Sequence, residues 1–232
     1  SILAVRAQIG IDTGRLQEAD QAARGSLAIL LPLAQADPHD VKLHSQLVAA
    51  LVVGSDLAID LKDLRLAQQR VELAQRWMRG LEQGLPRGDW LAMRCAVDQR
   101  AANVLTIQEH HDQARKVLRQ TAQALKSSPE SLRIASFRAS VLAQLGRSEL
   151  RAGDPGSAER CLLESAGLRQ SLGDRFGWTP TARLRIANQQ LRLAMTLSQG
   201  QRWPAVTRLA TQALRGIESL LHASPDDLSL RQ

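Results

Sequence analysis

An alanine that recurs at a nearly constant spacing constrains this chain more than any other feature. Five segments with similar surroundings place it at Ala19, Ala67, Ala114, Ala158 and Ala205, with spacings of 48, 47, 44 and 47 residues. Self-similarity at a period of this size is the signature of a stacked array of small structural units. The sequence therefore predicts a repeat protein.

Two other positions repeat in the same register: a turn residue five positions before the alanine, and a mostly small residue twelve positions before it. The turn positions are Gly14, Lys62, Glu109, Gly153 and Gly200, and the small positions are Ala7, Ser55, Ala102 and Gly146, with Leu193 as the exception. Segments containing Pro close most units, as in ADPHD at 36–40. Each unit is therefore predicted to be a helix, a short turn, a second helix and a connection that stops it.

The small residues predict where the two helices of a unit approach each other. Gly146 and Ala158 are twelve residues apart with a turn between them, so they can face each other in an antiparallel hairpin. A larger side chain at either position would overpack the contact, at a cost of about 1–3 kcal/mol.

The composition favours helices along the whole chain. Ala, Leu, Arg and Gln dominate, and these residues are good helix formers. Aromatic residues make up only 3% and Tyr is absent, whereas strands favour aromatic and β-branched residues. We therefore predict an all-α chain of ten helices in five antiparallel pairs, forming one repeat domain. The predicted units are 1–38, 39–86, 87–128, 129–177 and 178–232.

The segment LGRSELRAGDPGSAERCLLESA at 145–166 resembles the tetratricopeptide repeat (TPR) through Leu145, Gly146, Gly153, Asp154 and Ala158. The first unit matches through Ala7, Gly14, Ala19 and Pro38. The resemblance implies a right-handed solenoid of helical hairpins. Because the period exceeds the about 34 residues of the standard repeat, both helices are expected to be longer. Such long units look like arrays attached to bacterial serine/threonine protein kinases and other multidomain regulators.

In this family the first helices of the hairpins line a concave groove that receives a partner peptide or helix. The resemblance therefore implies a non-enzymatic interaction, sensing or regulatory module. Its expected partner is a protein or peptide, which can be acidic. In the register above, the groove residues are Gln99, Asn103, Gln144, Arg147, Arg151 and Gln190. Arg, Gln and Asn side chains suit backbone and carboxylate groups. The alternative is a helix face that is merely solvated.

The positive charge lies in the second half of the chain. The net charge is +7; residues 1–116 carry 14 basic and 14 acidic residues, and residues 117–232 carry 16 basic and 9 acidic residues. This excess indicates either a solvated basic surface or contact with an acidic partner or anionic surface. Nucleic-acid binding by the basic half is the alternative function. Scarce aromatics and scattered arginines argue against it.

No group of residues indicates catalysis, a cofactor or a metal. A Gly-rich phosphate loop after a strand is missing, and His110 and His111 at a turn have no partners at a metal-ligand spacing. Cys95 and Cys161 have no such spacing either and are expected to be free thiols. An enzyme is therefore not expected. The acidic pairs Asp60/Asp63 and Asp226/Asp227 and the single Asp154 fall at turns and helix ends, where they are interpreted as helix caps and partners of the helix dipole.

The aromatic residues near the C-terminal part mark two further positions. The connection GDRFGWTP at 173–180 carries Arg175, Phe176 and Trp178, which either cover the end of a helix pair or form a partner contact. Trp203, before Pro204, is expected to pack at a helix start.

The sequence leaves the compartment and the oligomeric state open. The apolar runs LAILLPLA and LVAALVV are shorter than a membrane span, and no secretory signal is visible. The chain begins at Ser1 with residues that already look helical, so we expect a fragment of a longer protein. It would be cytoplasmic, or extracytoplasmic if a transmembrane helix precedes it.

Overall fold

The chain is helical in the part that the structure describes. In a computed structural model, residues 14–128, 131–176, 180–199 and 201–223 are described, and they form nine α-helices and no strand. The helices are α2 (Leu16–Ala36), α3 (Val41–Asp60), α4 (Leu64–Leu81), α5 (Arg87–Ile107), α6 (His111–Lys126), α7 (Leu132–Arg151), α8 (Pro155–Phe176), α9 (Pro180–Gln199) and α10 (Trp203–Ala223). The all-α prediction is confirmed for these residues. The first predicted helix lies outside them, so the count of ten stays a prediction.

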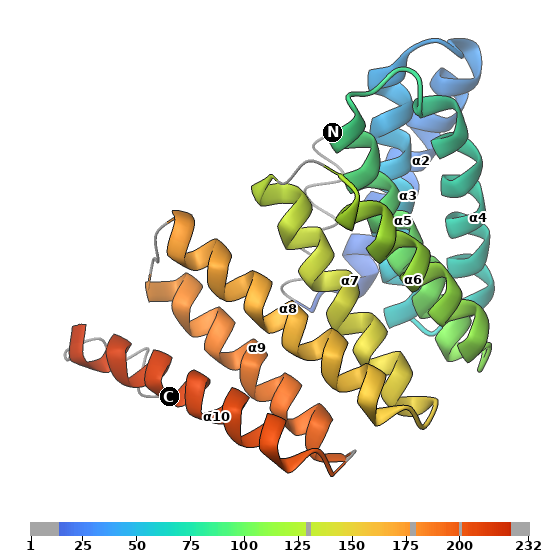
Figure 1. Cartoon of the computed structure of the whole chain (residues 1–232). Coiled ribbons are helices and arrows are strands. Elements are labelled where there is room, and N and C mark those ends of the chain that lie inside the picture. Colours follow the sequence, from blue (N-terminus) through green and yellow to red (C-terminus); the bar gives the residue numbers. More distant parts are fainter. Residues whose placement is uncertain (1–13, 129–130, 177–179, 200, 224–232) are drawn as a thin grey trace. The chain divides into compact units, whose positions relative to one another are not determined.

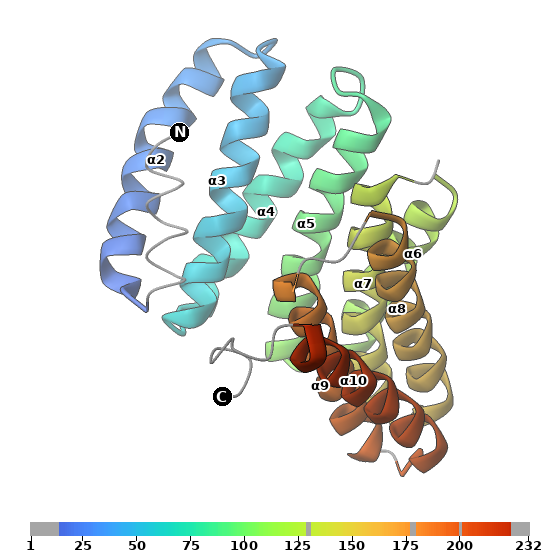
Figure 2. The ribbon, with the colours of Figure 1, turned by 90° about the vertical axis from the view of Figure 1, so that its left-hand side faces the viewer.

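The helices belong to two compact units, residues 1–117 and 118–232, and the boundary between them in the sequence falls within α6. In the first unit α2 packs on α3, α3 on α4 and α4 on α5; in the second, α7 packs on α8, α8 on α9 and α9 on α10. Figures 1 and 2 show these consecutive helices lying side by side within each unit. The packing of neighbouring helices in pairs is thus confirmed, while the single-domain organisation stays a prediction.

Helices that are two positions apart in the chain also touch. Helix α3 contacts α5 in the first unit, and α7 contacts α9 in the second. These four are the first helices of the predicted hairpins. Within each unit, the first helices of consecutive hairpins therefore lie against each other.

The turns within the hairpins lie where the sequence predicts them. The backbone angle φ is positive at Gly14 (74°), Lys62 (62°), Glu109 (64°) and Gly153 (79°). After Gly153, the Asp154 N–H donates to the carbonyl of Glu149 at 2.9 Å, five residues back. This bond is typical of a helix that ends on a left-handed residue. Gly200 lies outside the described residues, and its neighbour Gln201 has a φ of 56°.

Aspartates begin the helices that follow these turns. The Oδ1 atom of Asp63 accepts from the backbone N–H of Leu66 at 3.0 Å, and Oδ1 of Asp154 accepts from that of Ser157 at 2.9 Å. Hydrogen bonds from Ser157 also lower the pKa of Asp154. The predicted caps at Asp63 and Asp154 are confirmed, whereas Asp60 is the last residue of α3 and Asp226 and Asp227 lie outside the described residues. Pro155 occupies the first helical position after Asp154, where its missing N–H has no cost.

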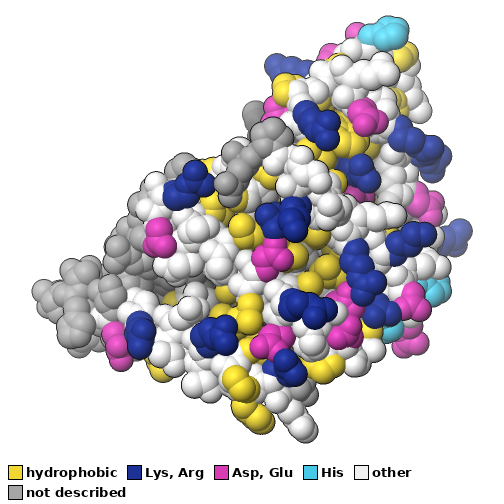
Figure 3. Space-filling model, in the orientation of Figure 1, with side chains coloured by type: hydrophobic (Ala, Val, Ile, Leu, Met, Phe, Trp, Pro, Cys, Tyr) yellow, Lys and Arg dark blue, Asp and Glu magenta, His cyan; other side chains and the backbone are white. Residues whose placement is uncertain are grey.

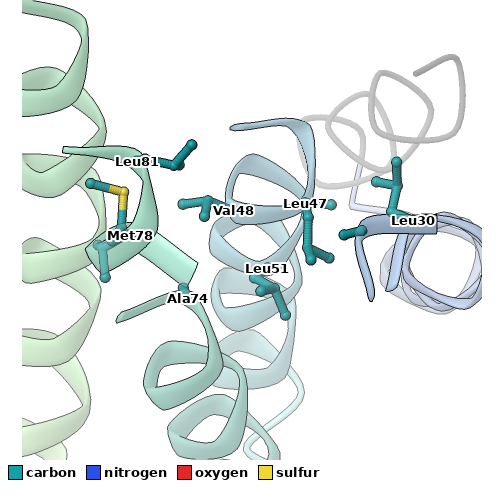
Figure 4. Close-up of a cluster of buried hydrophobic side chains, with 10 residues drawn as sticks. Leu30, Leu47, Val48, Leu51, Ala74, Met78 and Leu81 are labelled. Atoms are coloured by element: carbon teal, nitrogen blue, oxygen red, sulfur yellow. The ribbon is translucent and has the colours of Figure 1, made fainter. Parts of the chain in front are cut away.

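A core cluster of the first unit combines Val97 of α5 with apolar side chains of α2, α3 and α4. Figure 4 shows them pointing into the space between α2, α3 and α4. The labelled residues are Leu30, Leu47, Val48, Leu51, Ala74, Met78 and Leu81. The second unit has its own core around Leu162, Leu197 and Leu209, all without exposed surface.

Helix α3 is apolar and long enough, by length and composition alone, to cross a membrane. Its best 18-residue window has a mean hydropathy of 1.2, and half of that window is buried. The same helix packs against α2, α4 and α5, and a core helix of a soluble protein also has this composition. The expectation of no membrane span stays a prediction.

Candidate functional site

Three of the predicted groove residues have exposed side chains. Asn103 lies on α5, and Arg147 and Arg151 lie one turn apart on α7; all three are exposed, while Gln144 on α7 is half-buried. Asn103 and Arg147 stand eleven residues before Ala114 and Ala158, respectively. They therefore occupy the same register position in consecutive hairpins.

The other two predicted groove residues are buried. Gln99 has 8% of its surface exposed and Gln190 has 4%, so neither side chain offers much surface to a partner. The reason is that a first helix also packs on the preceding hairpin: α5 contacts α3 and α4, and α9 contacts α7 and α8. Its buried face is therefore wider than a single hairpin would require.

The second unit contains a pocket of about 220 Å³ that draws residues from three helices. Helix α7 contributes Arg147, α8 contributes Arg169, and α9 contributes Arg192. The remaining lining residues are Ser140, Ala143 and Leu193. Among the described residues, this lining includes three guanidinium groups and no carboxylate.

Helical spacing and the core explain why these side chains meet. Ser140, Ala143 and Arg147 stand at positions i, i+3 and i+7, so they share one face of α7. Ala143 and Leu193 belong to the core of the second unit. The core therefore forms an apolar floor, and the arginine stems can pack at its edge while their charged ends remain in the pocket.

The protein around the pocket disfavours the charged form of two of its arginines. Desolvation lowers the pKa of Arg147, and repulsion from Arg151 lowers it further. Desolvation also lowers the pKa of Arg169, with a second contribution from Arg147. Both side chains remain cations at neutral pH because guanidinium groups do not lose their proton in proteins. Positive charge is therefore concentrated in a partly desolvated place.

Three glutamates of α7 and α8 pair with arginines outside this pocket. The pairs are Glu149–Arg119, Glu164–Arg138 and Glu159–Arg202. Glu149 is the most deeply placed, with 1% of its surface exposed, and accepts from Nε of Arg119 at 2.9 Å. Helix α9 has no acidic residue in its sequence. These carboxylates are thus committed elsewhere.

Arg147 and Arg192 form no ion pair with another residue in the described ranges. Both residues are exposed as well as lining the pocket. The second unit also holds the whole positive excess of the chain, since the charges of residues 1–116 balance. An anionic ligand could therefore reach two arginines without displacing an internal carboxylate.

The first unit has a different pocket, of about 250 Å³, between α4 and α5. Its lining residues are Gln75, Met78, Arg79, Glu82, Trp90, Arg94, Val97 and Asp98. The guanidinium of Arg94 lies 5.2 Å from the Trp90 ring centroid, and its Nε donates to Asp98 at 3.4 Å. Because this pocket is lined by acidic as well as basic side chains, it does not favour an anionic ligand as the arginine pocket does.

Of the predicted positions around the aromatic residues of the second unit, Trp203 differs from its prediction. Arg175 is exposed in the last turn of α8, whereas the side chain of Phe176 and all of Trp178 lie outside the described part. Trp203 begins α10 but has 59% of its surface exposed, so the predicted packing of Trp203 is wrong. Ala205 in the same turn of α10 has no exposed surface. Residues two positions apart on a helix do not share a face, so Trp203 lies on the side of this turn that faces solvent.

The two cysteines are free, as predicted. Cys95 on α5 is buried and Cys161 on α8 is half-buried. Burial raises the pKa of Cys95 to about 12 and that of Cys161 to about 11, which makes both poor nucleophiles because only the thiolate reacts. In the described ranges, no group of three His, Cys, Asp or Glu residues is placed to hold a metal ion.

Sequence reasoning missed Arg169 and Arg192 as members of the arginine pocket. Arg169 lies on a second helix, and only first helices were considered for the groove. Arg192 directly precedes Leu193, which occupies the repeating small position in the fifth unit. Arg192 comes close to Arg147 only because α9 packs on α7 and α8. The signal available in the sequence was an arginine on each of three consecutive predicted helices in a half with excess positive charge.

No protein-family model matches this sequence, and no curated protein matches it. Among solved structures, the crystal structure of BtubC (BKLC) from P. vanneervenii resembles it with a TM-score of 0.62. The match covers 91% of this chain and 85% of that one, at 14% sequence identity. At this identity the likeness shows the fold alone, an all-helical arrangement of repeated units similar to helical hairpins.

Proposed function

We propose that this chain is a non-enzymatic interaction module, a right-handed TPR-like solenoid of five hairpins that binds a protein or peptide along its first helices. The observation that carries the proposal is the contact between α7 and α9, which brings Arg147 and Arg192 to one pocket on consecutive first helices. The wider setting we propose is regulation within a larger bacterial signalling protein.

The register of the exposed residues supports an extended partner. Asn103 and Arg147 occupy equivalent positions in consecutive hairpins, and Arg151 follows Arg147 by one turn. In a repeat array, equivalent positions recur on each hairpin, so each unit offers a surface on its own first helices. Such a surface suits an extended peptide or a helix better than a small molecule.

Site-specific photo-crosslinking in cells that naturally make the protein tests this assignment. A benzophenone amino acid is placed at Asn103 or Arg151, and at Arg208 as the control, which is exposed on the second helix α10. We expect a discrete heavier adduct from positions 103 and 151 and none from position 208. Adducts from position 208 alone, or from none of the three positions, would contradict a binding surface on the first helices.

The distribution of charged side chains favours a protein partner over nucleic acid. On the face shown in Figure 3, Lys and Arg side chains lie among Asp and Glu side chains instead of forming one basic stripe. Binding to a phosphate backbone weakens steeply with salt. We therefore expect random duplex DNA and RNA to give no retained complex in a shift assay at physiological salt. A complex that persists there would favour the alternative.

A further inference from the structure

We propose that the pocket formed by Arg147, Arg169 and Arg192 binds a phosphate monoester carried by the protein partner. The inference rests on the proposed function and deepens it, because it names the chemical group that the second unit recognises. A phosphorylated side chain would enter between α7, α8 and α9 while the flanking peptide follows the exposed residues of α7.

The number and origin of the basic groups support an oxyanion with more than one charge. Three helices each supply one guanidinium to a single pocket of about 220 Å³, and its described lining includes no carboxylate. Guanidinium groups donate paired hydrogen bonds to the oxygens of phosphate and carboxylate groups. Clusters of arginine are a recurring way to recognise phosphorylated or acidic motifs.

A phosphate monoester fits the charge of the pocket better than a single carboxylate. It carries about −1.5 to −2 at neutral pH and has three acceptor oxygens, whereas a carboxylate carries one charge and two oxygens. One carboxylate would compensate only one of the two positive charges of Arg147 and Arg192, which form no ion pair with another described residue. The repulsion between Arg147 and Arg169 is relieved more fully by the dianion.

The shape of the pocket favours a side chain over a membrane surface. The arginines come from three different helices, and Ala143 and Leu193 of the core form the floor between them. A ligand must therefore enter a recess, as a phosphorylated side chain on a peptide can. A lipid headgroup would have to leave the plane of its bilayer to do the same.

Fluorescence anisotropy with the whole chain and three short labelled peptides provides the test. The peptides share a neutral Gly-Ala sequence and carry phosphoserine, Glu or Ser at the centre. We expect the phosphoserine peptide to bind at least about tenfold more tightly than the other two. Each substitution Arg147→Gln or Arg192→Gln should weaken that binding about tenfold, the usual effect of losing a hydrogen bond to a charged group.

Arg208→Gln is the matched control because it removes the same charge from an exposed position of the same unit outside the pocket. It should change the affinity less than about twofold, since distant surface charges are screened by salt. Thermal unfolding of each variant verifies that the fold is intact. Equal affinity for the three peptides, or an equal loss in Arg208→Gln, would overturn the proposal.

Two further probes distinguish the source of the phosphate. Inorganic phosphate should compete with the phosphoserine peptide for wild-type protein. Arginine-dependent binding of inorganic phosphate or of phosphatidic acid vesicles, without binding of the phosphoserine peptide, would overturn the assignment to a protein partner.

The crosslinking experiment separates this inference from the proposed function. Adducts at positions 103 and 151 without any preference for phosphoserine would leave the interaction module standing and remove only the phosphate assignment. Phosphoserine binding that depends on Arg147 and Arg192, without those adducts, would keep the pocket and contradict the extended surface on the first helices.

Discussion

A Cβ atom on Gly146 would lie 2.6 Å from Cγ of Leu162 and 2.7 Å from its Cδ2. Leu162 has no exposed surface and belongs to the core of the second unit, so neighbouring side chains restrict its movement. The carbonyl oxygen of Ala158 would lie 3.2 Å from the same Cβ. Helices α7 and α8 therefore meet where only glycine fits without displacement, as the spacing of Gly146 and Ala158 in the sequence predicts.

We expect Gly146→Ala to lower the free energy of unfolding by about 1 kcal/mol. Overpacking against Leu162 costs about 1–3 kcal/mol, which outweighs the gain of about 0.5–1 kcal/mol from replacing a glycine within a helix. Ala158→Leu, at a position without exposed surface, should cost about 1–3 kcal/mol for the same reason. Urea unfolding followed by circular dichroism measures both.

Gly167→Ala is the control for this contact. Gly167 lies on the exposed side of α8, and a Cβ there would meet nothing within 4 Å. The substitution should therefore raise the stability by about 0.5–1 kcal/mol through helix propensity alone. If Gly146→Ala raised it by the same amount, the close contact between α7 and α8 would be disproved.

The left-handed turn residues predict a pair of opposite effects. Gly153 has a φ of 79° and Lys62 has a φ of 62°, a conformation that costs an ordinary residue about 1–2 kcal/mol. Gly153→Ala should therefore destabilise the chain by about 1 kcal/mol or more. Lys62→Gly should stabilise it by about 0.5–1 kcal/mol, because the greater freedom of glycine in the unfolded chain offsets part of the gain.

Thermal and urea unfolding of the two turn variants and of Glu109→Gly test this expectation. Glu109 has a φ of 64°, so its replacement by glycine should act like Lys62→Gly. A loss of stability in both glycine variants would mean that the exposed side chains make a contribution that exceeds the backbone strain.

The sequence predicted what local and periodic signals determine. The turn positions, the caps at Asp63 and Asp154, and the close approach at Gly146 depend on residues within one hairpin. A first helix is also covered by the preceding hairpin, as α5 is by α3 and α4 and α9 is by α7 and α8, and a single sequence does not reveal how far that cover extends. Gln99 and Gln190 therefore face the interior instead of a groove.

Side chains that meet across helices were beyond the sequence pattern. Arg169 and Arg192 reach Arg147 only because α9 packs on α7 and α8. Asp20 and Arg70 are fifty positions apart in the sequence. Nothing in the repeat pattern predicts that their side chains form a pair. Such long-range pairings depend on the rotation of each helix about its axis, which hydrophobic periodicity determines only approximately.

We expect Asp20→Ala to destabilise the first unit by about 3 kcal/mol. Asp20 on α2 and Arg70 on α4 have 7% and 6% of their surfaces exposed. Arg70 donates to the carboxylate of Asp20 at 3.5 Å and to the carbonyl of Gly54 on α3. Desolvation lowers the pKa of Arg70, and Asp20 opposes that shift, so removing the carboxylate leaves a buried cation without its counter-charge.

Arg24→Ala is the matched control for Asp20. Nε of Arg24 donates to the same carboxylate at 2.6 Å, but 67% of its side chain is exposed. An exposed ion pair contributes about 0–1 kcal/mol, so this variant should unfold at nearly the wild-type urea concentration. Equal losses in Asp20→Ala and Arg24→Ala would show that burial of Arg70 is not what makes Asp20 important.

Arg147→Ala should change the stability by less than about 0.5 kcal/mol. Arg147 is exposed and makes no ion pair with another residue of the described ranges, and surface substitutions of this kind are close to neutral. Removing it also relieves repulsion with Arg151. Unfolding of the domain by Arg147→Ala, measured in urea, would contradict its assignment to a binding surface.

The two thiols should react slowly with iodoacetamide in the native protein at pH 8. The thiolate is the reactive form, and burial raises the pKa of Cys95 to about 12 and that of Cys161 to about 11, from 9.0. The thiolate fraction is therefore lowered about a thousandfold at Cys95 and about a hundredfold at Cys161, since each pKa unit is tenfold.

The half-buried Cys161 should react before the buried Cys95. Above the ordinary thiol pKa of 9.0, the unfolded chain loses these protons first, so the stability should fall as the pH rises further. Mass spectrometry of alkylated native protein measures the order, and a titration in denaturant without reductant should count two thiols per chain. Equal rates in native and denatured protein would contradict the burial of both side chains, and a titration that finds no thiol would contradict their free state.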